Sequence, residues 1–566
     1  MIQGGHLVAQ ALKAEGVTHL FTLCGGHIQA IYDGCLHEGI DVIDVRHEQS
    51  AGHAADGYAR ATGKVGVCAV TAGPGVTDVV TAAANALRAS VPMVIIGGAG
   101  PTVFKHMGSL QDMDHVELMR PVCKWSASVT EARRLGEYVS MAFRKAATGV
   151  PGPVFLEMPL DLLMEYLDPS AHPLPTRYRT HARTAPDAEA LDEAAALFRA
   201  AERPVAIMGS QLRWSRDPEA TLRRFMDTFG CPVFVNGMAR GLVDPTGPHF
   251  RNRSRSGALR KADLVLVFGT PFDFRLQYGV QAPLTPGSQS GTVGSMLLQM
   301  TQPVIHPDAK VIQVDLDASE IGRNRGVDVG VVGDSGLVLE GLIARCAGQT
   351  GDMTDWNATV DAIEEKKWSK MRAEMALDSS PPNPLRLCAE VNDFLVPGDI
   401  VIGDGGDFVA TAAYTLKVHG VGTWMDPGPL GTLGVGPGYA MAAKLAHPDR
   451  KVVLMLGDGS FGLNGMEFEA MARQGIKVVG IIGNDACWTQ IHRGQEEMYG
   501  AERCVATKLD YTRYDKMAEA LGCHGEFVET VEGLRPALER AFASEKPAVV
   551  NVKIAKSDFR KGAISV

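Results

Sequence analysis

The chain has 566 residues, enough for three or four domains of ordinary size, and its composition is that of a globular protein, with 45% hydrophobic and 21% charged residues. The formal net charge is −10 and no basic block occurs, which argues against nucleic-acid binding. No apolar run is long enough to span a membrane, and the N-terminus does not resemble a signal peptide, so we expect a cytoplasmic protein with no membrane partner.

The first part of the chain, residues 1–167, alternates helical and strand patterns, as expected for a parallel sheet with helices on both faces. Helices are predicted over 5–15, 29–38 and 77–90, and strands over 17–24, 41–45, 65–71 and 92–97.

Two segments of this first part carry residues that could do chemistry. The segment RHEQSAGHAADGYAR, residues 46–60, places Glu48 just past a strand end at the start of a helix. An isolated acid there is ordinarily explained by the helix dipole. The segment GSLQD, residues 108–112, contains Gln111, for which a solvated loop residue is the alternative. His27, after the strand over 17–24, is a further catalytic candidate.

The middle of the chain reads as a linker, residues 168–189, followed by a second α/β unit, residues 190–347. Arg275 and Arg325 of this unit could meet phosphate groups, although exposed arginines more often have no specific role. A polar stretch, residues 348–384, is a second predicted linker and contains a predicted helix over 361–376.

The third α/β unit, residues 385–552, contains three polar turns at predicted strand ends. The first, Asp404 to Asp407, offers backbone N–H groups to a diphosphate. The other two, GDGS at 457–460 and GND at 483–485, follow apolar strands. Ligands of open parallel sheets lie at the carboxyl ends of the strands, so Asp458 and Asn484 should project into one crevice. Their oxygen atoms suit Mg²⁺.

These motifs resemble those of a known family. GDG followed by Asn after 24 residues resembles the diphosphate–metal motif of thiamine-diphosphate (ThDP) enzymes. The segment at 46–60 resembles the HEQ-A-HxAxGYAR segment of the acetolactate synthase superfamily, and GTLGVG at 431–436 resembles its GTMG segment. GSLQD matches the GxFQE loop of that superfamily only in part, since Leu and Asp replace Phe and Glu.

The resemblance implies three doubly wound parallel-sheet α/β domains. In chain order these are a pyrimidine-binding domain, a central domain and a diphosphate-binding domain. It implies that Asp458, Asn484 and the Ala486 carbonyl hold Mg²⁺, and that Glu48 hydrogen-bonds N1′ of the ThDP pyrimidine. It further implies that Leu433 supports the bent shape of ThDP and that Gln111 faces the reacting carbons. The other implied cofactor contacts are Gly406, Asp407, Phe408, Gly431, Gly457, Gly459, Ser460 and Thr489.

The same resemblance implies a homodimer or homotetramer with the active site between subunits. In relatives the central domain binds the ADP part of FAD or of coenzyme A, or nothing. Residues 485–505 could form a lid, with Trp488, Gln490, Glu496 and Glu497 as substrate-contact candidates. A plain surface helix explains the two acids equally well.

The tail, residues 553–566, contains Phe559, Arg560 and Lys561. Disorder is the default for a terminus, but a basic tail with an aromatic residue could close on a phosphorylated substrate such as CoA. The DFRKG ending is similar to that of acetolactate-synthase-like proteins that act as 2-hydroxyacyl-CoA lyases, particularly bacterial lyases for branched substrates. FDFRLQYG at 272–279 departs from the RFDDRVTG pattern of acetolactate synthases.

The resemblance therefore favours a lyase that converts 2-hydroxyacyl-CoA to formyl-CoA and an aldehyde or ketone. Acetolactate synthase, or another 2-oxo acid decarboxylase or carboligase, is the first alternative. A catalytically silent relative that only binds nucleotide is an alternative of another class.

Overall fold

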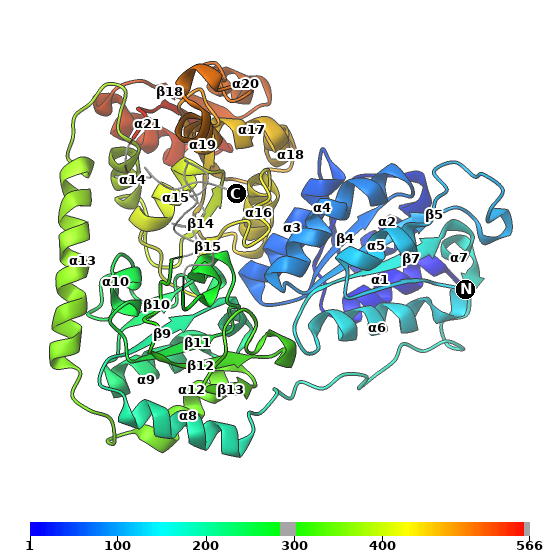
Figure 1. Ribbon diagram of the computed structural model, residues 1–566. Helices are drawn as coiled ribbons and strands as arrows, with labels where there is room; N and C mark the ends of the chain where they lie inside the picture. Colours follow the sequence, from blue (N-terminus) through cyan, green and yellow to red (C-terminus); the bar gives the residue numbers. More distant parts are fainter. Residues whose placement is uncertain (283–301, 558, 560–566) are drawn as a thin grey trace.

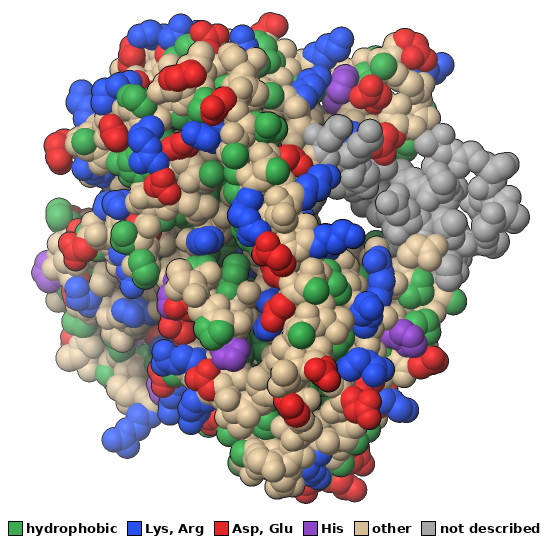
Figure 2. Space-filling view, turned by 90° about the vertical axis from the view of Figure 1, so that its left-hand side faces the viewer, with side chains coloured by type: hydrophobic (Ala, Val, Ile, Leu, Met, Phe, Trp, Pro, Cys, Tyr) green, Lys and Arg blue, Asp and Glu red, His purple; other side chains and the backbone are tan. Residues whose placement is uncertain are grey.

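The computed structural model describes residues 1–282, 302–557 and 559. Three α/β domains follow one another along the chain, each built on a parallel sheet with helices against it, which confirms the predicted fold class (Figure 1). None of the described helices combines the length and the apolar character needed to cross a bilayer. On the face shown in Figure 2, acidic and basic side chains are intermixed.

The N-terminal domain is a six-stranded parallel sheet of order β3-β2-β4-β5-β7-β6. Its strands are β2 (His19–Thr22), β3 (Asp41–Asp44), β4 (Gly66–Val70), β5 (Met93–Ala99), β6 (Trp125–Ser128) and β7 (Pro153–Pro159). Its helices are α1 (Gly4–Ala14), α2 (Gln29–Glu38), α3 (Glu48–Thr62), α4 (Pro74–Ala89), α5 (His115–Met119), α6 (Leu135–Ala147) and α7 (Leu160–Met164). A small antiparallel pair, β1 (Ile2–Gln3) with β8 (Tyr166–Leu167), joins the two ends of the domain.

The central domain has a five-stranded parallel sheet of order β10-β9-β11-β12-β13. Its strands are β9 (Pro204–Met208), β10 (Val233–Val235), β11 (Leu264–Phe268), β12 (Lys310–Asp315) and β13 (Val329–Val332). Its helices are α8 (Ala188–Ala200), α9 (Pro218–Phe229), α10 (Arg255–Leu259) and α12 (Ser335–Cys346). The predicted loop over 283–295 lies outside the described residues.

The long helix α13 (Thr354–Met375) leads to the C-terminal domain, whose sheet has the order β15-β14-β16-β17-β19-β18. Its strands are β14 (Ile400–Asp404), β15 (Trp424–Met425), β16 (Val452–Gly457), β17 (Val479–Asn484), β18 (His524–Val528) and β19 (Ala548–Lys553). Its helices are α14 (Pro384–Asn392), α15 (Asp407–Thr415), α16 (Gly436–Ala446), α17 (Asp458–Asn464), α18 (Glu467–Arg473), α19 (Thr489–Tyr499), α20 (Tyr514–Ala520) and α21 (Val531–Ala543).

The N-terminal and C-terminal domains meet where α3 packs against α16 (Figure 1). The helices approach closely because Gly57 faces Tyr439, where a Cβ atom would lie 2.7 Å from the Tyr439 Cα. Asp56 accepts hydrogen bonds from Arg60 (2.6 Å) and from the Tyr439 hydroxyl (2.7 Å) in the buried interface. A buried ion pair whose remaining hydrogen bonds are made fixes one arrangement of the two helices.

The sequence prediction differs from the structure near the GDG turn. The expected turn over 457–460 is absent, because α17 begins directly at Asp458. The helix expected over 465–474 is α18 (Glu467–Arg473), and a separate short helix, α17, precedes it. Gly465 lies between the two helices, where a Cβ atom would lie 2.6 Å from the Phe461 carbonyl oxygen. The helix expected over 361–376 begins seven residues earlier, at Thr354.

Candidate active site

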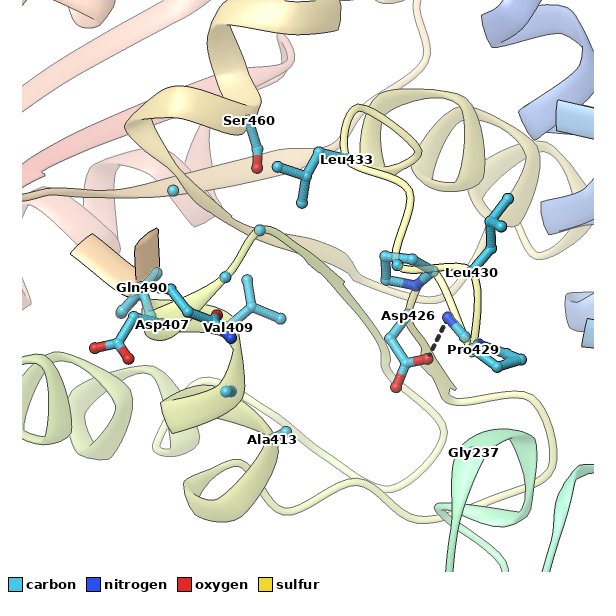
Figure 3. Close-up of a pocket in the computed structure, with 18 of the residues that line it drawn as sticks. Gly237, Asp407, Val409, Ala413, Asp426, Pro429, Leu430, Leu433, Ser460 and Gln490 are labelled. Atoms are coloured by element: carbon cyan, nitrogen blue, oxygen red, sulfur yellow. Dashed lines mark hydrogen bonds between the residues drawn. The ribbon is translucent and has the colours of Figure 1, made fainter. Parts of the chain in front are cut away.

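A cavity of about 830 Å³ lies between the central and C-terminal domains. The C-terminal domain contributes the residues after β14 and β16 and the loop at 426–433, and the central domain contributes Asn236 to Met238. Figure 3 shows Leu433 and Ser460 close together on one side of this cavity and Asp407 and Gln490 on another. Thirteen of the sequence-predicted site residues line it: Arg275, Gly406, Asp407, Phe408, Gly431, Leu433, Gly457, Asp458, Gly459, Ser460, Trp488, Thr489 and Gln490.

Asp458 is the first residue of α17 and is only 2% exposed. Its carboxylate accepts hydrogen bonds from the backbone N–H groups of Gly459 (2.9 Å) and Cys487 (3.3 Å). Burial, and then repulsion by Asp485, raises the pKa of Asp458 to about 7. Two neighbouring carboxylates, one buried and one partly buried, are stabilised by a cation.

Asn484 ends β17, which pairs with β16, and its side chain is fully buried. The Asn484 amide nitrogen donates to the Thr512 carbonyl (3.3 Å) and the Asn551 side chain (3.1 Å), which fixes the orientation of the amide. The amide oxygen therefore turns to the opposite side, where it accepts from the Ala486 N–H (3.2 Å). Ala486 has φ of 55°, an uncommon value for a residue with a side chain.

Asp458, Asn484 and Ala486 thus bring oxygen-bearing groups to two neighbouring strand ends. Carboxylate, amide and backbone oxygens are the ligands of hard cations such as Mg²⁺, and diphosphate oxygens commonly complete such a site. The neighbouring carboxylates of Asp458, which is buried, and Asp485, which is partly buried, and the oriented amide of Asn484 fit a divalent ion.

The turn after β14 lines the cavity and leads directly into α15. Gly405 has φ of 142°, which favours glycine, and α15 begins at Asp407 with its N-terminus facing the cavity. The Asp407 carboxylate forms a two-point ion pair with Arg493 of α19, at 2.8 and 3.0 Å. The Asp407 side chain is therefore engaged by Arg493, and the contact of the backbone N–H groups of this turn with a diphosphate stays a prediction.

The loop that carries Leu433 is held by Asp404, a residue that the sequence analysis did not assign to the site. The Asp404 carboxylate accepts from the backbone N–H groups of Gly434 (3.0 Å) and Gly436 (2.7 Å), while Asn464 donates to the Gly434 carbonyl (2.7 Å). Burial raises the pKa of Asp404 to about 6. An acidic residue at a strand end before two glycines was the available signal.

Helix α19 covers one side of the cavity. The Trp488 ring lies against Gly459, where a Cβ atom would be 2.5 Å from the ring, and Gln490 lies against Gly406 in the same way, at 2.8 Å. The rigid Trp488 ring leaves room only for glycine at position 459, whereas the end of the Gln490 side chain could move away from a larger residue at 406. Glu496 and Glu497 of the same helix are exposed and do not line the cavity.

Glu48, His27 and Gln111 lie in the N-terminal domain and do not line this cavity. Glu48 is the first residue of α3 and is 8% exposed. Two residues before Glu48, the backbone N–H of Arg46 donates to both carboxylate oxygens of Glu467, at 3.1 and 3.0 Å. Glu467 is the first residue of α18, so this helix fixes the segment that carries Glu48.

A second group forms around Thr71, after β4. The Thr71 hydroxyl lies 3.1 Å from His27 Nδ1 and 3.5 Å from Gln111 Oε1. His27 and Gln111 are therefore neighbours, as their common sheet edge suggests. Burial lowers the pKa of His27, which favours the neutral imidazole.

The length of α3 separates Glu48 from the cavity of its own chain. Arg60 lines the cavity and donates to the Asp426 carbonyl (2.7 Å), and Glu48 lies twelve residues earlier on the same helix. At 1.5 Å per residue these two positions are about 18 Å apart along the helix axis. A single chain therefore presents two separate groups of predicted site residues.

A second cavity of about 450 Å³ adjoins the first and is rich in arginine. We call it the basic cavity; it is lined by Arg240, Arg251, Arg253, Arg255, Arg275, Lys367, Tyr414, Trp424 and Phe559, among others. Phe559 of the tail lies beside Tyr414, with the Arg253 guanidinium 5.0 Å from its ring centre. Arg560 and Lys561 lie outside the described residues, and Arg325 is buried elsewhere in the central domain.

Comparisons with known proteins agree with this arrangement. Models of the thiamine pyrophosphate enzymes match residues 2–118 as the N-terminal TPP binding domain, 191–342 as the central domain and 404–552 as the C-terminal TPP binding domain. The chain is 37% identical to 2-hydroxyacyl-CoA lyase 2 of Caenorhabditis elegans, over 100% of this chain and 91% of that protein.

Two further relatives are similar over nearly their whole length. The acetolactate synthase large subunit IlvG of Mycobacterium tuberculosis is 39% identical over 97% of this chain and 95% of its own. The human 2-hydroxyacyl-CoA lyase 2 is 35% identical over 100% of this chain and 92% of its own. The chain belongs to the thiamine pyrophosphate (ThDP) enzyme family, and it is a ThDP-dependent enzyme.

Proposed function

We propose that this enzyme is a Mg²⁺-dependent carbon–carbon lyase that cleaves 2-hydroxyacyl-CoA to formyl-CoA and an aldehyde or ketone. The observation that carries the proposal is the basic cavity directly beside the cofactor cavity. The names of the relatives from Caenorhabditis elegans and human support the same activity.

The basic cavity has the chemistry needed for the nucleotide end of CoA, which carries three phosphate groups. Burial, together with the nearby Arg240 and Arg275, lowers the pKa of Arg255, so positive charge is crowded here. A phosphate relieves this crowding and accepts charge-assisted hydrogen bonds. Tyr414 and Phe559 offer aromatic faces to an adenine ring.

The two cavities adjoin each other. Asn236, Arg240, Arg275, Tyr414 and Trp424 line both of them. A long ligand can therefore place its phosphates in the basic cavity and its thioester beside Leu433 and the metal turns. This is the supporting evidence for an acyl-CoA substrate; the central domain is not required to bind a separate ADP.

The proposed roles of the residues follow from their positions. ThDP, when bound, supplies a carbon nucleophile and an electron sink for breaking a bond next to a carbonyl carbon. Asp458, Asn484 and Ala486 would hold the diphosphate through Mg²⁺, and Leu433 would support the pyrimidine and thiazolium rings. Glu48 would hold a proton at N1′ of the pyrimidine.

Because Glu48 does not line its own chain's cavity and lies about 18 Å along α3 from Arg60, which does, we propose that it serves the cavity of a second subunit. A homodimer is the smallest assembly that brings the two groups together, and a homotetramer is a pair of such dimers. His27 and Gln111 would reach the substrate from the same side as Glu48.

The activity is tested by incubating the enzyme with ThDP, Mg²⁺ and a branched 2-hydroxyacyl-CoA, and by measuring formyl-CoA with mass spectrometry. Formation of formyl-CoA with a matching aldehyde or ketone supports the proposal. If no formyl-CoA forms with straight or branched substrates, the lyase assignment is rejected.

Replacing Arg255 with glutamine tests the basic cavity. A hydrogen bond to a charged group contributes about 1.5–3 kcal/mol, so we expect KM for the CoA thioester to rise about 10–150-fold. The kcat should change little, because Arg255 is remote from the metal turns. Steady-state kinetics with the CoA thioester and with the corresponding pantetheine thioester, which lacks the nucleotide, measure both quantities.

The pantetheine thioester is the internal control, since the variant and the wild type should use it equally well. Arg323→Gln is the matched protein control, because Arg323 is paired with Glu320 on the surface at 2.8 Å. Equal KM values of the variant and the wild type for the CoA thioester would show that the nucleotide binds elsewhere.

Acetolactate synthase remains the second candidate, favoured by the 39% identity to the Mycobacterium tuberculosis protein. Pyruvate consumption with acetolactate formation distinguishes it. A silent nucleotide-binding relative is disfavoured because Glu48, Asp458 and Asn484 are all present in arrangements suited to catalysis.

A further inference from the structure

A buried histidine–glutamate pair lies behind the loop that carries Gln111. His115 is the first residue of α5 and is 1% exposed, and its Nδ1 lies 3.0 Å from Glu157 Oε2 on β7. On its other side, His115 Nε2 accepts a hydrogen bond from the backbone N–H of Gly73 at 2.8 Å. The three groups form a continuous chain through the interior of the N-terminal domain.

These partners fix the protonation of His115. A backbone N–H group only donates, so His115 Nε2 must be without a proton. The imidazole proton therefore resides on Nδ1 and is donated to the Glu157 carboxylate. A histidine oriented by a carboxylate in this way has one tautomer and one ring orientation.

Gly73 in turn supports Gln111. Gly73 has φ of 58° and ψ of −112°, a conformation open to glycine alone. A Cβ atom at Gly73 would lie 2.8 Å from the Gln111 Cβ and 3.0 Å from its backbone oxygen, so the two backbones are in direct contact. Gln111 itself has φ of 61°, so its loop is held in an unfavourable conformation by its surroundings.

We propose that His115 and Glu157 are positioning residues that hold the Gly73 peptide, and through it Gln111, in the geometry used for carbon–carbon bond cleavage. The inference rests on the proposed function for the role of Gln111. The hydrogen bonds that link Glu157, His115 and Gly73 are separate from the one that holds the segment of Glu48, in which the Arg46 N–H donates to Glu467. Loss of the pair should therefore affect cleavage and spare cofactor activation.

The test is His115→Phe, which keeps a ring in the buried space and removes the acceptor for Gly73. We expect formyl-CoA release to slow about tenfold or more, as for a buried N–H left without a partner. Hydrogen–deuterium exchange at C2 of bound ThDP, which depends on Glu48, should stay within about twofold of wild type. A crystal structure should show Gln111 displaced by about 1 Å or more, a shift that is sufficient to slow catalysis.

His115→Gln is the conservative variant, because its amide oxygen can accept from Gly73, and it should recover most of the lost rate. His19→Phe, a half-buried histidine of the same domain, should leave all three readouts unchanged. If His115→Phe does not fold, Glu157→Leu gives the same test, because His115 is then free to place its proton on Nε2, facing Gly73.

The proposal is overturned if a folded variant cleaves at the wild-type rate with Gln111 in place, or if cleavage and C2 exchange fall together. A wild-type enzyme that releases no formyl-CoA rejects the proposed function instead. In that case the position of Gln111 in the His115→Phe structure still decides whether the pair positions it.

Discussion

Replacing Glu48 with glutamine is expected to lower kcat by about 10²–10⁴-fold, the usual contribution of a general acid or base that transfers a proton in the transition state. A carboxyl group can hold or release a proton at N1′ of the pyrimidine, and a carboxamide of the same size cannot. ThDP affinity should be largely retained, because the diphosphate is held by a different domain. Steady-state kinetics, ThDP titration and C2 hydrogen–deuterium exchange measure the three effects.

Asp78→Asn is the matched control for this prediction. The Asp78 carboxylate lies within 4.8 Å of the Glu48 carboxylate and is exposed, so its replacement changes the local charge without removing the proposed proton carrier. The control should keep kcat within about threefold, as expected for a surface charge. Turnover that survives in Glu48→Gln would show that the role assigned to Glu48 is wrong.

Replacing Asp458 with asparagine is expected to weaken ThDP binding in the presence of Mg²⁺ by about 10²-fold or more. Loss of a residue that only supports a metal ligand typically costs 10–100-fold in metal affinity, and loss of a ligand carboxylate should cost at least as much. Isothermal titration of ThDP at saturating Mg²⁺ is the measurement. Asp485→Asn, which removes a neighbouring, partly buried carboxylate that is not a predicted ligand, should weaken binding less.

Asp458→Asn, although it weakens cofactor binding, should increase the stability of the protein without metal. Burial raises the pKa of Asp458 from its usual 3.8 to about 7, so the folded state keeps a proton that the unfolded state releases between these values. Folding is therefore penalised increasingly as pH rises from 4 to 7, by up to about 4 kcal/mol above pH 7.

Asparagine carries no charge and avoids this penalty. In metal-free buffer, urea unfolding should show Asp458→Asn to be more stable than the wild type at pH 8 and nearly equal to it at pH 4. If the difference in unfolding free energy between the variant and the wild type is the same at pH 4 and pH 8, Asp458 does not have the raised pKa of a buried carboxylate.

The three-domain architecture was predictable because the sequence of each domain contains short apolar strands that end in polar, glycine-rich turns. The GDG turn and Asn484 could be placed together from the sequence, since the carboxyl ends of neighbouring parallel strands meet at one sheet edge. The structure brings Asp458 and Asn484 to paired strands, as this argument requires.

The supporting residues were not predictable in the same way. Asp404 and His115 accept hydrogen bonds from backbone groups 30 and 42 positions away in the sequence, and Glu157 contacts the His115 side chain across 42 positions. No local pattern encodes such contacts, because they depend on how loops from different strands pack together. The ion pair of Asp407 with Arg493 is a further example, since it joins two segments that the sequence analysis treated separately.

The account depends most on Glu48 of one subunit meeting the metal-bound diphosphate site of another. Co-expression of the Glu48→Gln and Asp458→Ala chains, followed by purification of the mixed oligomer, tests this directly. If sites form between subunits, one of the two sites in a mixed dimer is intact, so the purified mixed dimer should have about half of the wild-type activity. If each chain builds its own site, every site carries one lesion, and the mixture will be no more active than either variant alone.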